Sequence, residues 1–278
     1  MPHPPARLVA AAVSAVVVVA AGGGFVWWRS GSEPAESLPA PAAERLPGRP
    51  RATEPAAPSL PGPGPAQVPR LQNAERQLPG SWVDVGAATA DARAPLVIGL
   101  HGRGDSAEHF AALAGRLGPR LAWRMLQGPL PYSDGYQWFK MDADDGGAAE
   151  VARALAYIDA HVRAAGPRRI ALVGFSQGCF AAAAYIVQHP ERVRAVLCIG
   201  GGLPALPEPP AATARPAILF VHGGEDAVVP VQAARDAMRR MEALGFSPEF
   251  IEHADGHTVP DAEVDRMRGW LERKLRGS

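Results

Sequence analysis

Short apolar runs alternate with longer amphipathic segments from about residue 81 to the C-terminus. The runs are continuously apolar, which is typical of parallel strands that are covered on both faces. They predict strands at residues 95–100, 121–126, 169–173, 195–199, 217–221 and 249–252, and helices at residues 107–117, 148–165, 178–188, 231–244 and 262–275. This alternation predicts an α/β domain over residues 81–278, with a mostly parallel central sheet and helices on both faces.

The pattern before this domain is different. Residues 8–28 contain no charged side chain, and a helix of that length reaches about 30 Å, the thickness of a bilayer core. We therefore expect residues 1–29 to form a hydrophobic helix that is either a transmembrane anchor or a cleaved signal segment.

The flanking residues bear on these two alternatives. The pair Trp27-Trp28 is typical of a membrane interface and favours the anchor, whereas the small residues at 19–21 suit a signal cleavage site. Arg7 precedes the segment and no acid accompanies it, which places the C-terminal bulk outside the cytoplasm. We expect a membrane-anchored protein with an extracytoplasmic domain, or a secreted or periplasmic protein if the signal is cleaved.

Residues 30–80 form a third region, rich in proline, alanine and glycine. Such a composition cannot bury a core and adopts extended, solvated conformations. We therefore expect a linker that acts as a spacer between the N-terminal segment and the α/β domain.

Composition excludes several classes of function. The chain has 28 Lys and Arg against 28 Asp and Glu, so no basic surplus indicates nucleic-acid binding.

Its two cysteines, Cys179 and Cys198, lie in apolar runs and are interpreted as buried thiols, although neighbouring strands can bring them together. No spacing of His or Cys indicates a metal site, and we expect no cofactor.

One short motif carries candidate chemistry. Gly174-Phe175-Ser176-Gln177-Gly178 follows a predicted strand and precedes a predicted helix, which is the setting of a nucleophile elbow. In an elbow the serine lies on a tight turn above the sheet, and the glycines relieve crowding between strand and helix. Ser176 is therefore the candidate nucleophile.

A serine nucleophile needs a base, and the base needs an acid that orients it. His257 is the preferred base because it lies in the turn between the last strand and the last helix, with His253 as its rival. Asp226 follows the strand at residues 217–221 and is the candidate acid, with Glu225 as competitor. The order Ser, Asp, His is the one expected for an elbow hydrolase.

The glycine-interrupted loop at residues 100–106 follows the first predicted parallel strand. Ester hydrolysis passes through a tetrahedral anion, which two backbone N–H groups stabilise. In elbow hydrolases one donor follows the nucleophile and the other lies in such a loop, so we expect an oxyanion hole from Gln177 and Arg103. His101 and His222 are interpreted as supports of loop structure.

Together these motifs resemble the phospholipase/carboxylesterase family of α/β-hydrolases, which includes the acyl-protein thioesterases. The resemblance covers roughly residues 90–276. It rests on the sequences LHGRGD at 100–105, GFSQG at 174–178, DAVVP at 226–230 and GHTVP at 256–260. It implies an α/β-hydrolase fold with a triad of Ser176, Asp226 and His257 and backbone donors at Arg103 and Gln177.

The resemblance also implies substrate contacts. Trp138 lies in a segment similar to the aromatic stretch of the family's acyl pocket, and Leu203 lies in a segment similar to a loop beyond the elbow. A packing role for Trp138 stays open. The chain departs from the family at Cys179, where a small glycine is usual, and at Arg103, whose side chain either favours an anionic group or points to solvent.

These features predict a membrane-tethered serine hydrolase that cleaves carboxylic esters or thioesters through an acyl-enzyme on Ser176. The expected partner is a small-molecule ester or thioester, with the membrane contacted through the N-terminal segment. A secreted feruloyl or acetyl esterase acting on polysaccharides is an alternative, because a proline-rich spacer suits such an enzyme. A non-catalytic, membrane-anchored binding module is a second alternative, and it requires the loss of a triad member.

Overall fold

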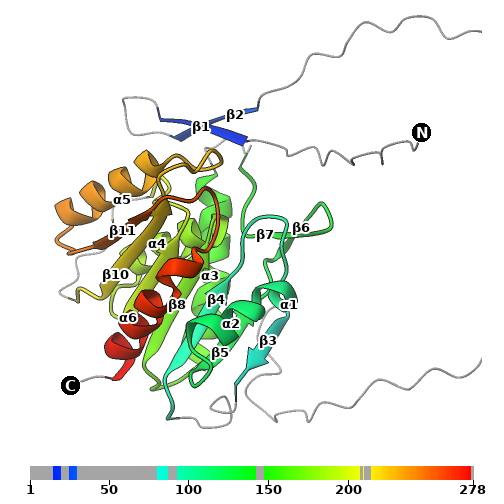
Figure 1. Cartoon of the computed structure of the whole chain (residues 1–278). Helices are drawn as coiled ribbons and strands as arrows, with labels where there is room; N and C mark the ends of the chain where they lie inside the picture. The colour runs from blue at the N-terminus through cyan, green and yellow to red at the C-terminus, as the bar shows by residue number, and fades with distance from the viewer. Residues whose placement is uncertain are drawn as a thin grey trace, which may run out of the picture. The chain divides into compact units, whose positions relative to one another are not determined.

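The computed structural model describes residues 15–19, 25–29, 80–86, 93–141, 147–206, 209 and 214–276 (Figure 1). The linker predicted over residues 30–80 lies, apart from Gly80, outside these described residues. The predicted α/β domain is therefore described over most of its length.

A seven-stranded sheet forms the centre of this domain, in the order β11-β10-β9-β8-β4-β5-β3. Neighbouring strands run parallel, except that β3 pairs antiparallel with β5 at one edge. The strands are β3 (Trp82–Val85), β4 (Leu96–Leu100), β5 (Ala122–Leu126), β8 (Ile170–Phe175), β9 (Ala195–Ile199), β10 (Ala217–Gly223) and β11 (Glu249–His253). The prediction of a mostly parallel central sheet is confirmed.

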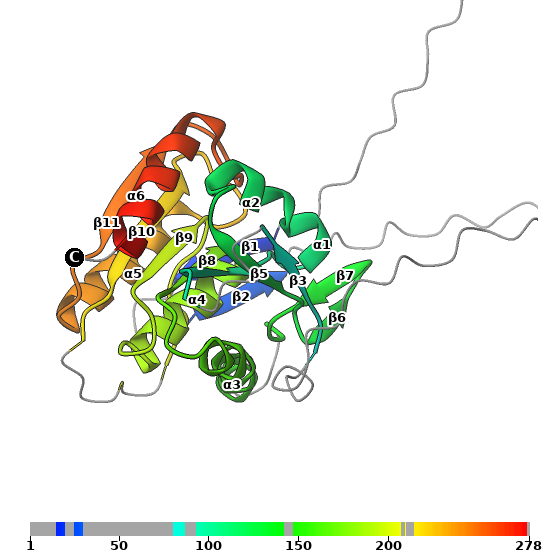
Figure 2. The ribbon, with the colours of Figure 1, turned by 90° about the horizontal axis from the view of Figure 1, so that it is seen from below.

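Helices cover both faces of this sheet (Figures 1 and 2). Their bounds are α1 (Ala107–Phe110), α2 (Ala112–Leu117), α3 (Ala148–Ala164), α4 (Gln177–Gln188), α5 (Val231–Ala243) and α6 (Val264–Arg276), the last preceded by the 3-10 turn Asp261–Glu263. Apolar residues of α3, α4 and α5 pack into one core, and those of α1, α2 and α6 pack into a second core on the opposite face. The two cores explain why β4, β5 and β9 are buried at every position.

Three short strands of the domain escape the hydrophobic pattern. One is β3, at the edge of the main sheet. The other two are β6 (Leu130–Tyr132) and β7 (Gly135–Gln137), which pair with each other in a separate antiparallel hairpin. Three or four residues are too few for a periodic signal, so tertiary contacts decide their pairing. In β3, the carboxylate of Asp84 accepts hydrogen bonds from Nε and Nη2 of Arg124 on β5, at 2.8 and 2.9 Å.

The N-terminal segment differs from its prediction. In place of the expected hydrophobic helix, its described residues form two strands, β1 (Ala15–Val19) and β2 (Phe25–Arg29), which pair antiparallel. Valine and aromatic residues favour strands, and the glycines at 22–24 disfavour a continuous helix. In the parts of the chain that the structure describes, no helix combines the length and apolar character needed to cross a membrane.

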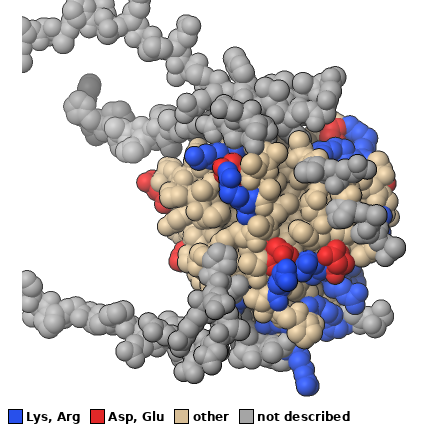
Figure 3. Space-filling view, turned by 180° about the vertical axis from the view of Figure 1, so that it is seen from behind, with Lys and Arg blue, Asp and Glu red and all other residues tan. Residues whose placement is uncertain are grey.

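Charged side chains are mixed over the face of the molecule shown in Figure 3, where Lys and Arg lie beside Asp and Glu. Surface ion pairs of the domain include Arg235 with Glu252 and Arg276 with Glu272, each with a nitrogen–oxygen distance of 2.6 Å. This distribution agrees with the neutral composition of the chain.

The crossing of α4 over the sheet is unusually close, because two glycines lie at it. A Cβ atom on Gly178 would lie 2.0 Å from the carbonyl oxygen of Leu100 on β4, and one on Gly174 would lie 2.2 Å from the carbonyl oxygen of Gly178. Both contacts are with backbone, which cannot rotate away as a side chain can. The close crossing therefore requires glycine at both positions.

We expect Gly178→Ala to lower the free energy of unfolding by about 2 kcal/mol, because the added methyl forces the helix and β4 apart. Gly115→Ala is the matched control, since a Cβ there, inside α2, meets no atom within 4 Å. That control leaves the free energy of unfolding unchanged or raises it by up to about 1 kcal/mol. Urea denaturation of the two variants and the parent protein measures both effects, and equal stability of Gly178→Ala and the parent would contradict the packing argument.

Candidate active site

Ser176 lies between β8 and α4 in a backbone conformation that residues with a side chain rarely adopt. Its φ is 51° and its ψ is −119°. Its N–H donates to the carbonyl of Ile199 on β9 at 2.9 Å, and its carbonyl accepts from the N–H of Cys179 at 2.9 Å. The surrounding backbone thus holds a strained turn, as a nucleophile elbow requires.

Asp226 and His257 are in direct contact. The distance between His257 Nδ1 and Asp226 Oδ2 is 2.7 Å. Because an ionised carboxylate can only accept, Nδ1 carries the proton and Nε2 of His257 keeps its lone pair. The pair therefore holds the imidazole in the tautomer that can take a proton from another group.

The carboxylate of Asp226 is buried yet kept ionised. Burial raises its pKa, but hydrogen bonds from His222, His257 and the backbone N–H of Val229 outweigh burial and hold the pKa well below its usual range. Its Oδ1 atom accepts from the N–H groups of Val228 and Val229 at 2.9 and 2.8 Å. The side chain is therefore anionic and fixed in orientation throughout the neutral pH range.

His257 also lies beside the elbow. Its ring centroid is 4.9 Å from that of Phe175, the residue before Ser176. A Cβ on Gly200 would lie 3.3 Å from Nδ1 and Cε1 of His257, so the glycine after β9 leaves room for the imidazole. The three candidate residues follow the carboxyl ends of parallel strands, Ser176 after β8, Asp226 after β10 and His257 after β11. They therefore lie on the same side of the sheet, where these strands end.

The rival residues take other positions. His253 is buried, and its Nδ1 accepts from the N–H of Asp255 at 3.3 Å. Glu225 is exposed. His222 supports the Asp226 loop, because its Nε2 donates to the carbonyl of Val229 at 2.7 Å and lies 3.4 Å from Asp226 Oδ2. Of the candidate bases, His257 is the one whose Nδ1 is 2.7 Å from Asp226.

The loop after β4 lies against the elbow. A Cβ on Gly102 would be 3.2 Å from the ring of Phe175 and 3.5 Å from Cβ of Ser176. Within the described residues, the backbone N–H groups of Arg103 and Gln177 have no acceptor. Two free N–H groups near a serine are what an oxyanion hole needs.

His101 braces this loop from behind. The fully buried ring donates from Nδ1 to the carbonyl of Gly102 at 2.7 Å and accepts at Nε2 from the N–H of Gly128 at 2.9 Å. Burial lowers its pKa, while the hydrogen bond to Gly102 and the charges of Asp105 and Glu108 raise it by less. The ring is therefore neutral, because a proton on Nε2 would face another N–H group.

The two expected substrate contacts, Trp138 and Leu203, lie in the core, each 1% exposed. The indole N–H of Trp138 donates to the carbonyl of His101 at 2.8 Å, which makes Trp138 a packing residue that supports the loop. Leu203 accepts at its carbonyl from Arg240. Neither residue lines the cavity beside Ser176, and a substrate contact at either stays a prediction.

A cavity beside Ser176 is lined by other residues. Its volume is about 40 Å³. The lining residues are Arg103, Phe139, Met141, Ser176, Gln177, Phe180, Val228 and Val229. Phe139 belongs to the aromatic stretch at 137–139 that the resemblance pointed to. Sequence reasoning did not single out Met141, Phe180, Val228 and Val229, although each lies within four residues of a predicted site residue.

The side chain of Gln177 shapes this cavity. Its Oε1 accepts from the N–H of Trp138, and its Nε2 donates to the carbonyl of Phe139, both at 2.8 Å. The first residue of α4 thus holds residues 138–139, which follow β7, alongside the elbow.

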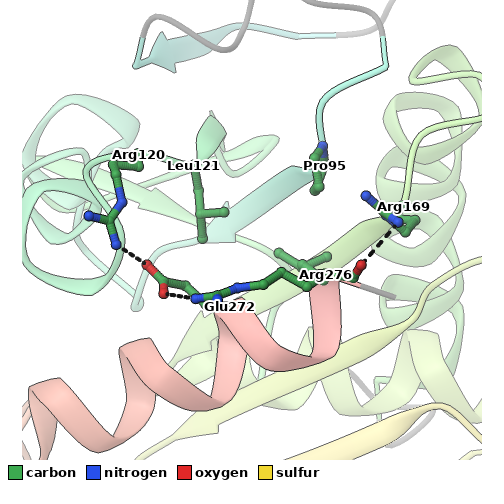
Figure 4. Close-up of a pocket in the computed structure, with 7 residues that line it drawn as sticks. Pro95, Arg120, Leu121, Arg169, Glu272 and Arg276 are labelled. Carbon is green, nitrogen blue, oxygen red and sulfur yellow. Dashed lines mark hydrogen bonds and ion pairs between the residues drawn. The ribbon is translucent and has the colours of Figure 1, made fainter. Parts of the chain in front are cut away.

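A larger cavity, about 480 Å³, lies at the amino-terminal ends of the parallel strands (Figure 4). Arg120 and Arg276 both pair with Glu272 there, and Arg169 donates to the carbonyl of Arg276. No serine, histidine or cysteine lines it. We therefore place the candidate active site at the smaller cavity, which contains Ser176.

Both cysteines are free and buried, as expected, and Cys198 Sγ donates to the carbonyl of Cys179 at 3.8 Å. Among the described residues, no group of three or more His, Cys, Asp or Glu is arranged to hold a metal ion.

Comparison with known proteins gives the family. Residues 123–268, about half of the chain, match the family described as serine hydrolase (FSH1). A probable inactive carboxylesterase of Oryza sativa subsp. japonica is 28% identical over 220 residues, which cover 68% of this chain and 89% of the relative. The carboxylesterase SOBER1 of Arabidopsis thaliana is 25% identical over 117 residues, which cover 40% of this chain and 51% of the relative.

Solved structures share the fold. A carboxylesterase from Mesorhizobium loti has a TM-score of 0.60 at 21% identity, covering 71% of this chain and 96% of its own. Esterase PE8 has a TM-score of 0.58 at 25% identity, covering 70% of this chain and 98% of its own. These likenesses agree with the resemblance to carboxylesterases of the α/β-hydrolase fold, and the chain belongs to the FSH1 family of serine hydrolases.

Proposed function

We propose that this protein hydrolyses short-chain carboxylic esters or thioesters through an acyl-enzyme on Ser176. The observation that carries the proposal is the 2.7 Å hydrogen bond between Asp226 and His257, next to a serine on a strained elbow. One relative is named a probable inactive carboxylesterase, so kinship alone does not imply activity. The proposal therefore depends on the residues of this chain.

Acylation uses the neutral His257 as base. Nε2 takes the hydroxyl proton of Ser176 as Oγ attacks the ester carbonyl, and the ionised Asp226 stabilises the resulting imidazolium. The carbonyl oxygen becomes an anion that accepts from the N–H groups of Arg103 and Gln177, each donor contributing about 3 kcal/mol. His257 then returns its proton to the leaving alkoxide or thiolate, which departs as alcohol or thiol.

Deacylation repeats these steps with water. His257 takes a proton from water as the hydroxide attacks the acyl-enzyme, and the same two N–H groups stabilise the second tetrahedral anion. Collapse of that anion breaks the bond to Oγ, and His257 returns the proton to Ser176. The carboxylic acid is released and the enzyme is restored.

The size of the cavity limits the acyl group. The cavity beside Ser176 is small, about 40 Å³. This favours a short acyl chain over a bulky aromatic feruloyl group. The walls are apolar at Phe139, Met141 and Phe180, which favours the methyl end of such a chain.

Ser176→Ala tests the proposed nucleophile. We expect kcat for p-nitrophenyl acetate and butyrate to fall by about 10⁴-fold or more, because no Oγ remains to form the acyl-enzyme. Ser247→Ala is the matched control, because Ser247 is exposed and lies before the start of β11, at the amino-terminal ends of the strands. Circular dichroism checks that both variants stay folded, and undiminished turnover by Ser176→Ala would refute the proposal.

The neutral state of His101 makes the oxyanion loop sensitive to pH. Its folded pKa is lowered, so the unfolded chain binds more protons below its ordinary value of 6.5. The free energy of unfolding therefore falls as pH is lowered through 6.5, by at most about 1.4 kcal/mol per pH unit for one proton. His101→Gln cannot titrate, so we expect its stability to fall less steeply between pH 7 and pH 5.

Denaturation at several pH values measures these slopes. His109→Gln is the matched control, because His109 on α1 is an exposed histidine with 86% of its side chain accessible. The slope of His101→Gln should be shallower than that of His109→Gln, which loses an exposed histidine instead of a buried one. If His101→Gln keeps the parent slope, the neutral, braced state of His101 is wrong.

A further inference from the structure

Arg103 lines the same cavity as Ser176. It is the one charged residue among those that line the cavity, and the other walls are Gln177 and apolar side chains. Its guanidinium carbon lies 4.9 Å from the centre of the Tyr132 ring, on the hairpin of β6 and β7. A cation over an aromatic face is held without neutralising its charge, so Tyr132 positions this arginine beside the cavity.

Arg103 differs from most arginines of the domain in its electrostatic environment. Arg116, Arg153, Arg235 and Arg268, for example, each pair with a carboxylate within 4.0 Å. Among the residues that the structure describes, no carboxylate lies within that distance of Arg103.

The acid closest in sequence to Arg103 already has other partners. Oδ1 of Asp105 accepts from the N–H of Ser106 at 2.8 Å and lies 3.4 Å from His109. Within the described residues, the Arg103 guanidinium therefore has no carboxylate partner and is able to form charge-assisted hydrogen bonds with another anion.

We propose that the Arg103 side chain binds a carboxylate of the substrate, so that the preferred substrates are short esters carrying a negative charge. This inference rests on the proposed function, because it specifies the substrate class of that same site. The guanidinium forms a planar fork that matches a carboxylate, and it is always charged.

Geometry limits where that carboxylate lies. The backbone N–H of Arg103 is a proposed oxyanion donor, and its guanidinium is one side-chain length away. The carboxylate must therefore lie a few bonds from the scissile carbonyl, on either the acyl side or the alcohol side of the ester. A neutral ester of the same size leaves the guanidinium without this partner.

Two pairs of esters distinguish the two sides. Monoethyl succinate against ethyl valerate places the charge on the acyl side, and 4-acetoxybenzoate against its methyl ester places it on the alcohol side. The measured quantity is kcat/KM for the charged ester divided by kcat/KM for its neutral partner, so that general effects on catalysis cancel.

We expect Arg103→Gln to lower this ratio about ten- to a hundredfold for one of the two pairs, the range of a charge-assisted hydrogen bond, mainly through KM. Arg103→Lys keeps the positive charge and should restore most of the ratio. A rise in salt from about 50 to about 500 mM, roughly half and five times the ionic strength at which the screening length is about 10 Å, lowers the parent's ratio as well.

Arg163→Gln is the matched control for net charge. Arg163 is exposed near the end of α3, shortly before β8 begins, and therefore lies towards the amino-terminal edge of the sheet. Its ratios should equal those of the parent protein. Equal ratios in Arg103→Gln and the parent, for both pairs, would overturn the proposal.

A binding measurement separates this inference from the proposed function. Calorimetry with succinate and with 4-hydroxybenzoate should give at least a tenfold weaker affinity of one of them for Arg103→Gln than for the parent. This holds whether or not any ester is hydrolysed. If the parent protein hydrolyses none of the four esters, the proposed function fails. If the parent and Arg103→Gln also bind both anions with equal affinity, the anion site fails as well.

Discussion

The position of Ser176, the proposed nucleophile, depends on the close approach of the first turn of α4 to the end of β4. Gly174 and Gly178 leave no room for a Cβ at this crossing, so the chain between them turns sharply and Ser176 takes a positive φ. Strain of this kind persists only where the surrounding structure holds it, and here two cores clamp the sheet from both faces. The same crossing brings the loop after β4 against Phe175, which places the N–H groups of Arg103 and Gln177 near the serine.

A second constraint is the buried charge of Asp226. Burial alone would raise the pKa of this carboxylate, but two histidines and two backbone N–H groups hydrogen-bond to it and keep it ionised. The protein thereby fixes the orientation of His257 before any substrate arrives, and no reorganisation is needed as the imidazolium forms. His222 serves the same end, because it ties the carbonyl of Val229 to the loop that presents the carboxylate.

The parallel strands and the candidate triad could be predicted because each has a local signal: a continuous apolar run, or a short polar turn directly after one. The burial of Trp138 could not, since it depends on a hydrogen bond to the carbonyl of His101, 37 residues earlier in the chain. The β6–β7 hairpin depends on backbone bonds between Gly104, Asp105 and Tyr136. In the N-terminal segment, uncharged character suggested a helix, while valine, aromatic and glycine content favoured the strands that the structure has there.

The central claim is that Asp226, through His257, makes Ser176 a nucleophile. The most direct measurement is the rate and site of covalent labelling by a fluorophosphonate, followed by mass spectrometry of peptides from the full chain. The account predicts a single adduct on Ser176 and a labelling rate lowered by about 10³-fold or more in Asp226→Asn, where the imidazole loses its fixed tautomer. An adduct on another residue, or equal rates in Asp226→Asn and the parent protein, would contradict it.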